Sequence, residues 1–211
     1  MAIRLNLTAI LEQIMSYDFE SFFRSSEPAR DKYLSRLFAL FSEHVVRCWC
    51  ACPQSRYEDL GRPTLYKPGF KYGHTIDFTL RDRVTRNTYV AELKCELEYA
   101  NYKYLRLTGS DQLLHHTSVA FAKFLEIAKA PAALDVRCKG RPISVDGAIL
   151  VWGASSPEGR CAVMAKYGFA DVLSLEMMLA DLQEWTPNGW AEFANRYRGW
   201  TNELFEFLRG A

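Results

Sequence analysis

Residues 76 to 96 (IDFTLRDRVTRNTYVAELKCE) constrain the fold more than any other stretch of the sequence. The segment consists of two short, apolar-rich runs around a polar centre that carries arginines. Alternation of apolar and polar residues is the pattern of a strand with one buried face. We therefore expect strands at residues 76–81 and 88–95, joined as a hairpin whose turn is centred between Val84 and Thr85.

Each expected strand also carries an acid, and the hairpin register brings the two acids together. A turn centred between residues 84 and 85 places Asp77 directly opposite Glu92, with Cβ atoms about 5 Å apart, where like charges destabilise a sheet. Because side chains alternate along a strand, Glu92 and Lys94 share one face. The other face carries the apolar side chains of Ile76, Phe78, Leu80, Leu93 and Cys95.

Three explanations account for this pair of acids. They could face solvent, with Lys94 forming a weak surface ion pair with Asp77. They could act as paired carboxylates in proton transfer, as in glycosidases, although the sequence offers no sugar-binding signature. They could also hold Mg²⁺, which prefers oxygen ligands and would turn the repulsion between Asp77 and Glu92 into attraction.

The whole chain is suited to one globular domain with few long-range electrostatic preferences. Its 211 residues are 49% hydrophobic, which is enough to bury a full core. Its 26 basic residues nearly balance its 25 acidic residues, so any polyanion must be met by local positive groups. The opening segment MAIRLNLTAILEQIM fits an amphipathic helix better than a secretory leader or a membrane span. We expect a cytoplasmic protein with no membrane partner.

The six cysteines include one cluster, CWCAC at residues 48 to 52. Its every-other-residue spacing differs from that of structural zinc knuckles, and no second knuckle follows. We interpret residues 45–52 as a strand in which the three thiols share one face of a sheet, buried and reduced.

The remaining elements follow from periodicity and from start and stop signals. A helix is expected from Pro28 through residues 34, 37, 38 and 41, and an irregular connection at residues 53–69. A long helix is expected between a cap at Thr108 or Ser110 and Pro131. Strands at 146–153 and 161–168 and helices at 174–185 and 188–210 complete the list. The order predicts an α/β fold with a mixed sheet flanked by helices.

An Asp at the end of an apolar run, about fifteen residues of hairpin and then Glu-x-Lys within VAELKCE together resemble the PD-(D/E)XK nuclease superfamily. The resemblance covers roughly residues 27–153 and departs from the motif where TID stands in place of PD. It implies a restriction-endonuclease-like mixed β-sheet flanked by helices, with extra N- and C-terminal helices. The expected division is one domain, with a helical extension at 1–26, a nuclease core at 27–170 and C-terminal helices at 171–211.

The resemblance implies a set of site residues. The catalytic residues are Asp77, Glu92, Lys94 and Gln112, the last by partial similarity to relatives that carry Gln on the following helix. The implied metal ligands are Asp77, Glu92, the backbone carbonyl of Leu93 and an acid from the helix before the first strand. A helical wheel places Glu27 on the apolar face and Glu43 on the opposite face, so Glu27 is preferred.

The implied activity is Mg²⁺-dependent hydrolysis of DNA phosphodiester bonds by an endonuclease, with Mn²⁺ able to substitute. The expected DNA contacts are Arg81, Arg83 and Arg86 at the hairpin tip, with Lys103 and Arg106 after the second strand. A homodimer or partner subunit is expected, because cutting both strands takes two sites, and the C-terminal helix is its expected contact. Two alternatives stay open: a catalytically inactive relative that binds DNA or protein, and an α/β interaction domain whose acids face water.

Overall fold

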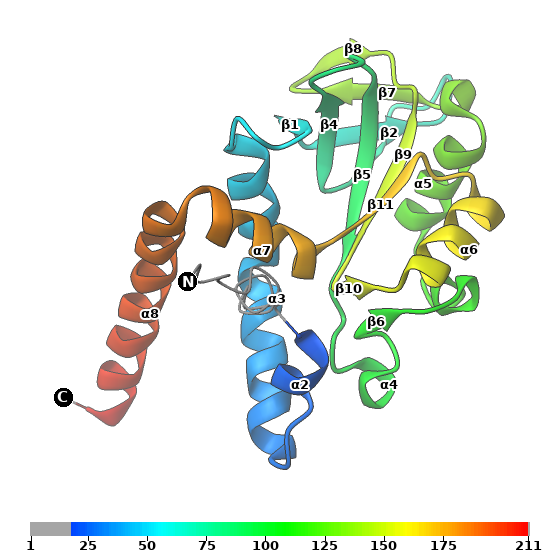
Figure 1. Ribbon diagram of the computed structural model, residues 1–211. Coiled ribbons are helices and arrows are strands. Elements are labelled where there is room, and N and C mark those ends of the chain that lie inside the picture. The colour runs from blue at the N-terminus through cyan, green and yellow to red at the C-terminus, as the bar shows by residue number, and fades with distance from the viewer. Residues whose placement is uncertain (1–17, 211) are drawn as a thin grey trace, which may run out of the picture.

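The computed structural model describes residues 18–210 and has a mixed five-stranded sheet at its centre (Figure 1). The strand order is β1 (Tyr57–Gly61), β4 (Phe78–Asp82), β5 (Thr88–Lys94), β9 (Gly147–Trp152) and β11 (Asp171–Ser174). The β1–β4 and β4–β5 pairs are antiparallel, whereas the β5–β9 and β9–β11 pairs are parallel. The predicted α/β class with a mixed sheet flanked by helices is confirmed.

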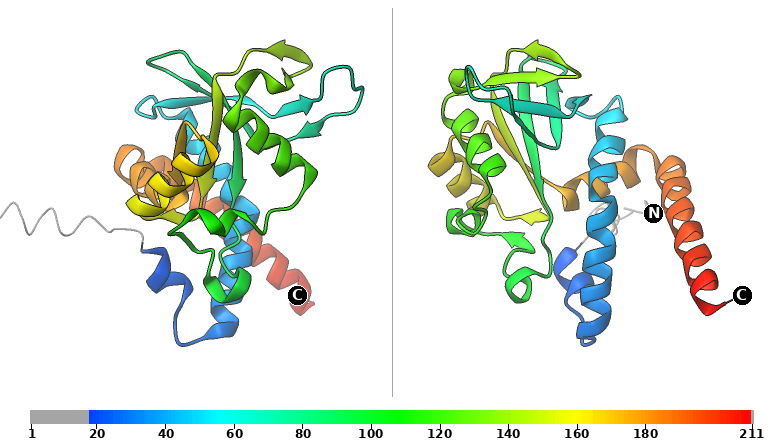
Figure 2. Two further views of the ribbon diagram at one scale, coloured as in Figure 1. Left: turned by 90° about the vertical axis from the view of Figure 1, so that its right-hand side faces the viewer. Right: turned by 180° about the vertical axis from the view of Figure 1, so that it is seen from behind.

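Helices cover both faces of this sheet, as the two views in Figure 2 show. One face packs against α3 (Pro28–Ala51), α7 (Leu175–Trp185) and the short α2 (Phe19–Phe23). The other face packs against α5 (Val119–Lys129) and α6 (Pro157–Tyr167). Each face therefore has its own apolar core, and β5 contributes side chains to both.

Smaller elements surround the three layers. A second sheet has the order β3 (His74–Thr75), β2 (Pro63–Tyr66), β7 (Asp135–Cys138) and β8 (Arg141–Ile143). The two-residue strands β6 (Arg106–Leu107) and β10 (Ala154–Ser155) pair in parallel. The short helices are α4 (Tyr99–Tyr102) and the 3₁₀ turns η1 (Ser110–Leu113) and η2 (Pro131–Ala133).

The hairpin register is confirmed. Phe78 pairs with Ala91 and Leu80 with Tyr89, so the line of opposed residues runs on to Asp77 and Glu92. Strand β4 begins only at Phe78, and Asp77 lies in the bend before it. Ile76 belongs to the core on the α5 side, not to the α3-side core that contains Phe78 and Leu80. The predicted apolar face is therefore wrong at Ile76, because strand alternation does not extend through the bend.

The predicted strand at 45–52 is wrong, because α3 continues to Ala51. A stripe of buried residues with helical spacing runs the length of α3 and packs it against α7 and β1. This packing outweighs the β preference of the β-branched and aromatic residues in VVRCWCAC. Cys50 and Cys52 are buried and Cys48 is half-buried, each bearing a free thiol, on a helix end and not on one face of a sheet.

Residues 53–69, expected to be irregular, contain β1 and β2. Pro63 stands at the first position of β2, where a missing N–H is tolerated. A bulge between Asp59 and Gly61 interrupts the β1–β4 register, and Gly61 adopts a φ of 118° that disfavours other residues. The Pro and Gly signals here mark the first residue of a strand and a bulge, and not a loop.

The predicted strand at 161–168 is also wrong, because the segment belongs to α6. The Ser156 side chain caps this helix, Pro157 occupies its first turn, and Gly168 ends it in the left-handed conformation. The fifth strand of the central sheet is β11, which is fully buried and follows this helix. Residues 171–174 are therefore part of the sheet and not of a C-terminal helical unit.

The helix predicted between 108 and 131 is shorter than expected. Residues 110–113 form η1, and α5 begins after Ser118, whose hydroxyl accepts a hydrogen bond from the backbone N–H of Phe121. The two C-terminal helices are confirmed as α7 and α8 (Pro187–Arg209). The first half of α8 packs on α3, where the Tyr197 hydroxyl lies 2.9 Å from His44 Nδ1, whereas Trp200, Leu204 and Phe207 are exposed. The apolar residues in the second half of this helix are therefore not packed in the core.

Within residues 18–210, no helix combines the length and apolar character needed to cross a membrane. The predicted amphipathic helix at the start of the chain lies outside the described residues.

Candidate active site

The predicted acids lie at the carboxyl end of β5, which is also where the neighbouring parallel strand β9 ends. Ligand sites of α/β sheets occur preferentially at this edge. Because β4 runs antiparallel to β5, the bend that carries Asp77 reaches the same edge. The hairpin therefore positions Asp77, Glu92 and Lys94 together.

Asp77 is held by the backbone of the neighbouring strand. The N–H of Leu93 donates a hydrogen bond of 2.8 Å to Asp77 Oδ2, and Arg62 Nη2 lies 3.5 Å from Oδ1. Burial raises the pKa of Asp77, the hydrogen bond from Leu93 opposes this shift, and the charge of Glu43 adds to it. The net pKa is above the ordinary value, so the charged form of Asp77 is under-stabilised.

Glu92 is more deeply buried and is incompletely satisfied. Its Oε1 accepts a hydrogen bond of 2.7 Å from Lys94 Nζ, whereas its Oε2 is buried without a hydrogen-bond partner. Burial raises the pKa of Glu92, and the nearby charge of Asp77 raises it further. Asp77 and Glu92 therefore repel each other where water is largely excluded, and Glu92 Oε2 has no hydrogen-bond donor.

Lys94 completes the group. Its ammonium lies 5.3 Å from the centre of the Phe121 ring on α5, and only 18% of its side chain is exposed. The pair between Lys94 and Glu92 is therefore largely shielded from water, unlike the solvated ion pair with Asp77 that the first explanation assumed.

The helix acid near the pair is Glu43 and not Glu27. Glu27 is the exposed N-cap residue of α3, sixteen residues before Glu43, which corresponds to about 24 Å along the helix axis. Of the two helix acids, Glu43 is the one whose charge raises the pKa of Asp77. The carboxylate of Glu43 is ion-paired with Arg47 at 3.3 Å, and Arg47 also binds Asp59 at 3.0 Å.

Gln112 has a structural role that conflicts with its predicted place at the metal. Its side-chain oxygen accepts hydrogen bonds from the backbone N–H groups of Thr108 and Gly109. Its side-chain nitrogen donates to the carbonyls of Lys103 and Arg106 at 2.7 and 2.9 Å. The amide of Gln112 is therefore fully used in holding the loop from 103 to 112.

The hairpin arginines lie toward the other end of the hairpin from the acids, and even Arg81, which pairs with Thr88, is four residues or about 13 Å along the strand from Asp77. Arg81, Arg83 and Arg86 all surround Glu58, at 2.6, 3.6 and 3.6 Å. The structure thus does not bring these three predicted DNA contacts to the site.

Lys103 and Arg106, by contrast, follow β5 at the same end as the acids. Lys103 is exposed beside the ring of Tyr104, at 5.9 Å. Arg106 is partly buried and binds Glu176 through two nitrogens, at 3.1 and 3.3 Å. Of these two predicted contacts, Lys103 is the one that is free to meet a substrate.

Two positive features near Asp77 were missed by sequence reasoning. Arg62 lies beside Asp77 with 53% of its side chain exposed. The loop between β2 and β3, residues 67–73 (KPGFKYG), leads into the Asp77 bend and carries two lysines with two exposed aromatic residues, Phe70 at 67% and Tyr72 at 89%. We call this loop the 67–73 arm. Its mixture of basic and aromatic residues is the signal that could have marked it.

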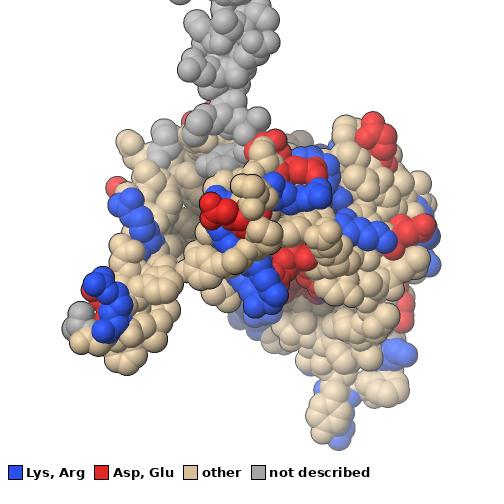
Figure 3. All heavy atoms as spheres, turned by 90° about the horizontal axis from the view of Figure 1, so that it is seen from below, with Lys and Arg blue, Asp and Glu red and all other residues tan. Residues whose placement is uncertain are grey.

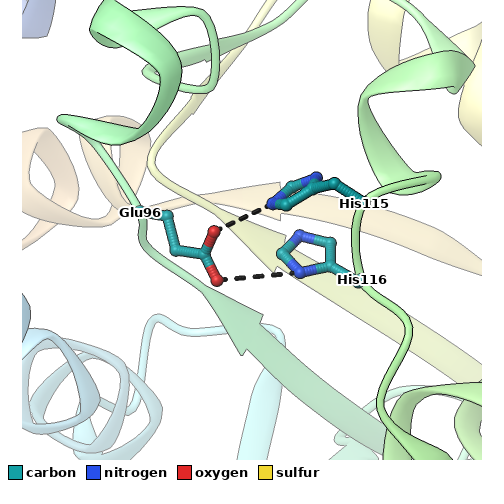
Figure 4. Close-up of side chains that lie close together, drawn as sticks. All are labelled: Glu96, His115 and His116. Carbon is teal, nitrogen blue, oxygen red and sulfur yellow. Dashed lines mark hydrogen bonds and ion pairs between the residues drawn. The ribbon is translucent and has the colours of Figure 1, made fainter.

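A second polar cluster lies next to Lys94. The carboxylate of Glu96 faces His115 and His116, with separations of 2.9 Å to His115 Nε2 and 3.7 Å to His116 Nδ1 (Figure 4). Among the described residues, this is the group of three whose nitrogen and oxygen ligand atoms all lie within 4.8 Å of one another. Burial lowers the pKa of His116 to about 4. Neither histidine is among the site residues that the sequence implied.

A cleft of about 570 Å³ opens between the first half of α3 and the segment that follows β5. Its lining includes Lys32, Arg36 and Glu96, so it reaches the second polar cluster from the side of α3. Seen from below, in Figure 3, Lys and Arg lie beside Asp and Glu on the described surface.

Comparison of the chain with protein-family models, with curated proteins and with solved structures finds no match, so the interpretation of the site depends on its own geometry.

Proposed function

We propose that the chain is a divalent-metal-dependent DNA endonuclease that hydrolyses phosphodiester bonds. The observation that carries the proposal is the state of Asp77 and Glu92, two shielded acids whose pKa values are raised and of which one oxygen, Glu92 Oε2, has no hydrogen-bond partner. An unpartnered buried carboxylate oxygen costs free energy unless a donor or a cation meets it. Mg²⁺ and Mn²⁺ are the hard, oxygen-seeking ions that fit such a pair.

The order of elements supports the same proposal. Helix α3, strand β1, the β4–β5 hairpin, helix α5 and strand β9 occur in the same order as in the restriction-endonuclease-like fold that the motif resembles, with smaller elements between them. The motif residues lie on the hairpin at the carboxyl edge of the sheet. The resemblance thus rests on the order of elements together with the three motif residues.

Asp77 and Glu92 would hold the ion, and Glu43 takes the place of Glu27 as the nearby acid of the helix, because its charge acts on Asp77. A bound Mg²⁺ supplies neutralisation of phosphate charge and lowers the pKa of a water molecule. The Leu93 N–H fixes the orientation of Asp77, so this ligand is in place before the ion arrives. Arg47 holds Glu43 by a partly exposed ion pair, which can exchange for a stronger partner.

Lys94 would act on the reacting phosphate. It is shielded by Phe121 and fixed by Glu92, and a positive charge in such a place stabilises developing negative charge more strongly than in water. If the Glu92 carboxylate binds a metal ion instead of Lys94, the Lys94 ammonium becomes free to contact the substrate.

The substrate would be gripped by groups on the same side as the acids. Arg62, Lys103 and the 67–73 arm supply positive charge for phosphates and aromatic rings for sugars or bases. These contacts carry no readable sequence preference, since specificity depends on which side chains enter which groove.

The test is digestion of linear, circular, branched and single-stranded DNA in Mg²⁺, in Mn²⁺ and in EDTA. The parent protein is expected to cleave at least one substrate only with metal, and the Asp77→Asn, Glu92→Gln and Lys94→Ala variants are expected to lose activity. Glu126→Gln is the matched control, because Glu126 is an exposed acid on α5. DNA binding without cleavage would instead identify a catalytically inactive member of the fold, and the enzyme proposal would then be abandoned.

A further inference from the structure

We propose a second metal site, formed by Glu96, His115 and His116, for a borderline divalent transition ion such as Zn²⁺. The site differs from the Asp77 and Glu92 pair in its residues and in its ligand chemistry. It goes beyond the proposed nuclease activity, which requires only the hard ion.

The first argument is the hydrogen bonding of His115. Its Nδ1 lies 2.8 Å from the carbonyl oxygen of Gln112, an atom that can only accept, so Nδ1 carries the proton. In the neutral ring, Nε2 is then a bare acceptor, yet it lies 2.9 Å from the acceptor Glu96 Oε2. Only a proton or a cation makes that contact favourable. A backbone carbonyl on the second ring nitrogen is also the usual companion of a metal-bound histidine.

The second argument is the unpartnered nitrogen of His116. Its side chain is only 6% exposed, and Nε2 is buried without a hydrogen-bond partner. Figure 4 shows the ring nitrogens of His116 turned toward Glu96 and the ring of His115. A buried nitrogen without a partner is unfavourable unless a ligand meets it, and an ion reached through Nε2 would do so.

The third argument is spacing. In a tetrahedral zinc site with bonds of about 2.0 Å, neighbouring ligand atoms are roughly 3.3 Å apart. One ligand atom from each of the three residues lies within 4.8 Å of the other two, and the shortest separation, from Glu96 Oε2 to His115 Nε2, is 2.9 Å. Small side-chain shifts therefore suffice to enclose an ion, and a fourth position stays open for water.

Aromatic neighbours hold the histidines in place. Tyr99 stacks on His115 at 4.8 Å, and Tyr104 packs against it at 4.0 Å. Phe121 and Trp152 pack against His116 at 5.0 and 5.9 Å. Such packing limits the rotamers of both rings.

The ligand set selects the class of ion. Two imidazoles with one carboxylate suit Zn²⁺ and related transition ions, whereas Mg²⁺ seeks oxygen ligands. Lys94 lies between the two sites along the chain, with Glu92 and Glu96 two residues to either side of it.

The experiment uses the full chain, freed of metal with a chelator and titrated with Zn²⁺ by calorimetry, followed by X-ray absorption on the loaded protein. One ion is expected to bind per chain, with nitrogen and oxygen neighbours at about 2.0–2.1 Å. Glu96→Gln and His115→Ala are expected to weaken Zn²⁺ binding at least tenfold. His116 is buried, so His116→Ala could fail to fold. In that case Glu96→Gln, at a partly exposed position, is the variant that tests the proposal.

Asp77→Asn and His44→Ala are the matched controls, since they remove an acid and an imidazole outside the cluster, and Zn²⁺ affinity is expected to stay unchanged. Unaltered affinity in Glu96→Gln and His115→Ala would overturn the proposal. Sulfur neighbours at about 2.3 Å would overturn it as well, because they would place the ion on the cysteines. Neither outcome bears on Mg²⁺-dependent cleavage of DNA, which Asp77→Asn tests separately.

Discussion

The two ends of the β4–β5 hairpin each hold an aspartate, and the surroundings of the two aspartates act in opposite directions. Asp82, at the tip, is completely buried and accepts hydrogen bonds from the N–H groups of Val84 and Thr85 and from Arg56. Burial alone would raise the pKa of Asp82, but these donors lower it below the ordinary value. Asp77, at the open end, has one backbone donor, and its pKa is raised.

The difference shows that burial does not by itself make an acid a candidate ligand. The number of hydrogen-bond donors around the carboxylate determines the direction of the pKa shift. Asp82 at the tip has several donors, whereas Asp77 at the open end has one backbone donor. The tip arginines likewise have Glu58 as their partner, and the Arg81 hydrogen bond is the main cause of the lowered pKa of Glu58. At the open end, the negative charges of Asp77 and Glu92 are incompletely neutralised, and a divalent ion could neutralise them. The proposed chemistry is therefore placed at this end.

The largest expected effect is on the rate of DNA cleavage, which should depend on Asp77 and not on Asp82. Asp77→Asn should lower the rate of Mg²⁺-dependent DNA cleavage about a thousandfold, roughly 4 kcal/mol of transition-state free energy, because a ligand of the ion is lost. Single-turnover cleavage measures the change. Circular dichroism should show an intact fold, since Asn can still accept the Leu93 hydrogen bond. A rate within tenfold of the parent would remove Asp77 from the site.

Removing the other aspartate should affect folding instead. Asp82→Ala leaves the N–H groups of Val84 and Thr85 without their acceptor and Arg56 without its carboxylate, and we expect a loss of about 3 kcal/mol in the free energy of unfolding. Urea unfolding measures it, with Glu126→Gln as control. If Asp82→Ala proved as stable as the parent, the account of the tip as a structural end would be wrong.

DNA affinity should also distinguish the ends. Lys67→Ala combined with Lys71→Ala on the 67–73 arm should weaken binding about tenfold and flatten its salt dependence, because two phosphate contacts are lost. Arg83→Gln combined with Arg86→Gln at the tip is the matched pair, and its effect should stay within about twofold. Fluorescence anisotropy at several salt concentrations compares them. Equal losses from both pairs would mean that DNA also reaches the tip.

The smallest expected effect is on the pH dependence of stability without metal. Because the folded pKa values of Asp77 and Glu92 are raised, the folded state keeps protons that the unfolded state has released. Their contribution is present below about pH 4, the ordinary carboxyl pKa, and is lost as the pH rises through the raised values. Asp77→Asn should therefore gain stability relative to the parent as pH rises.

Urea titrations from pH 3.5 to 7.5 test this trend, and added Mg²⁺ should reverse it by binding only the parent. Asp82 provides the internal contrast, because its lowered pKa gives stability that is lost as pH falls through the folded value. A parent that gained stability over Asp77→Asn with rising pH would contradict the raised pKa.

The hairpin and its register could be predicted from the sequence because both are local. Alternation fixes which residues share a face, and the polar centre fixes the turn. Helices α7 and α8 were predictable for the same reason. The CWCAC segment was not, because its burial against distant elements overrides the β preference of its residues.

The choice of Glu27 over Glu43 shows a further limit. A helical wheel gives the angle of a side chain around the axis but not its height along the axis relative to a strand edge. Glu27 has a favourable angle at the wrong end of α3, whereas Glu43 lies near the strand edge that carries the acids. The cluster of histidines was not predictable, because Glu96 and His115 meet only through the fold.

Gln112 links the parts of this edge. Its side chain joins the segments around Lys103 and Thr108, and its own carbonyl receives the ring N–H of His115. One residue thus braces the loop after β5 and one candidate ligand at once. Because the loop and His115 are already held in place by Gln112, they lose little conformational freedom when a metal ion binds. The affinity for the ion should therefore depend on the charge and geometry of the ligands more than on the ordering of side chains.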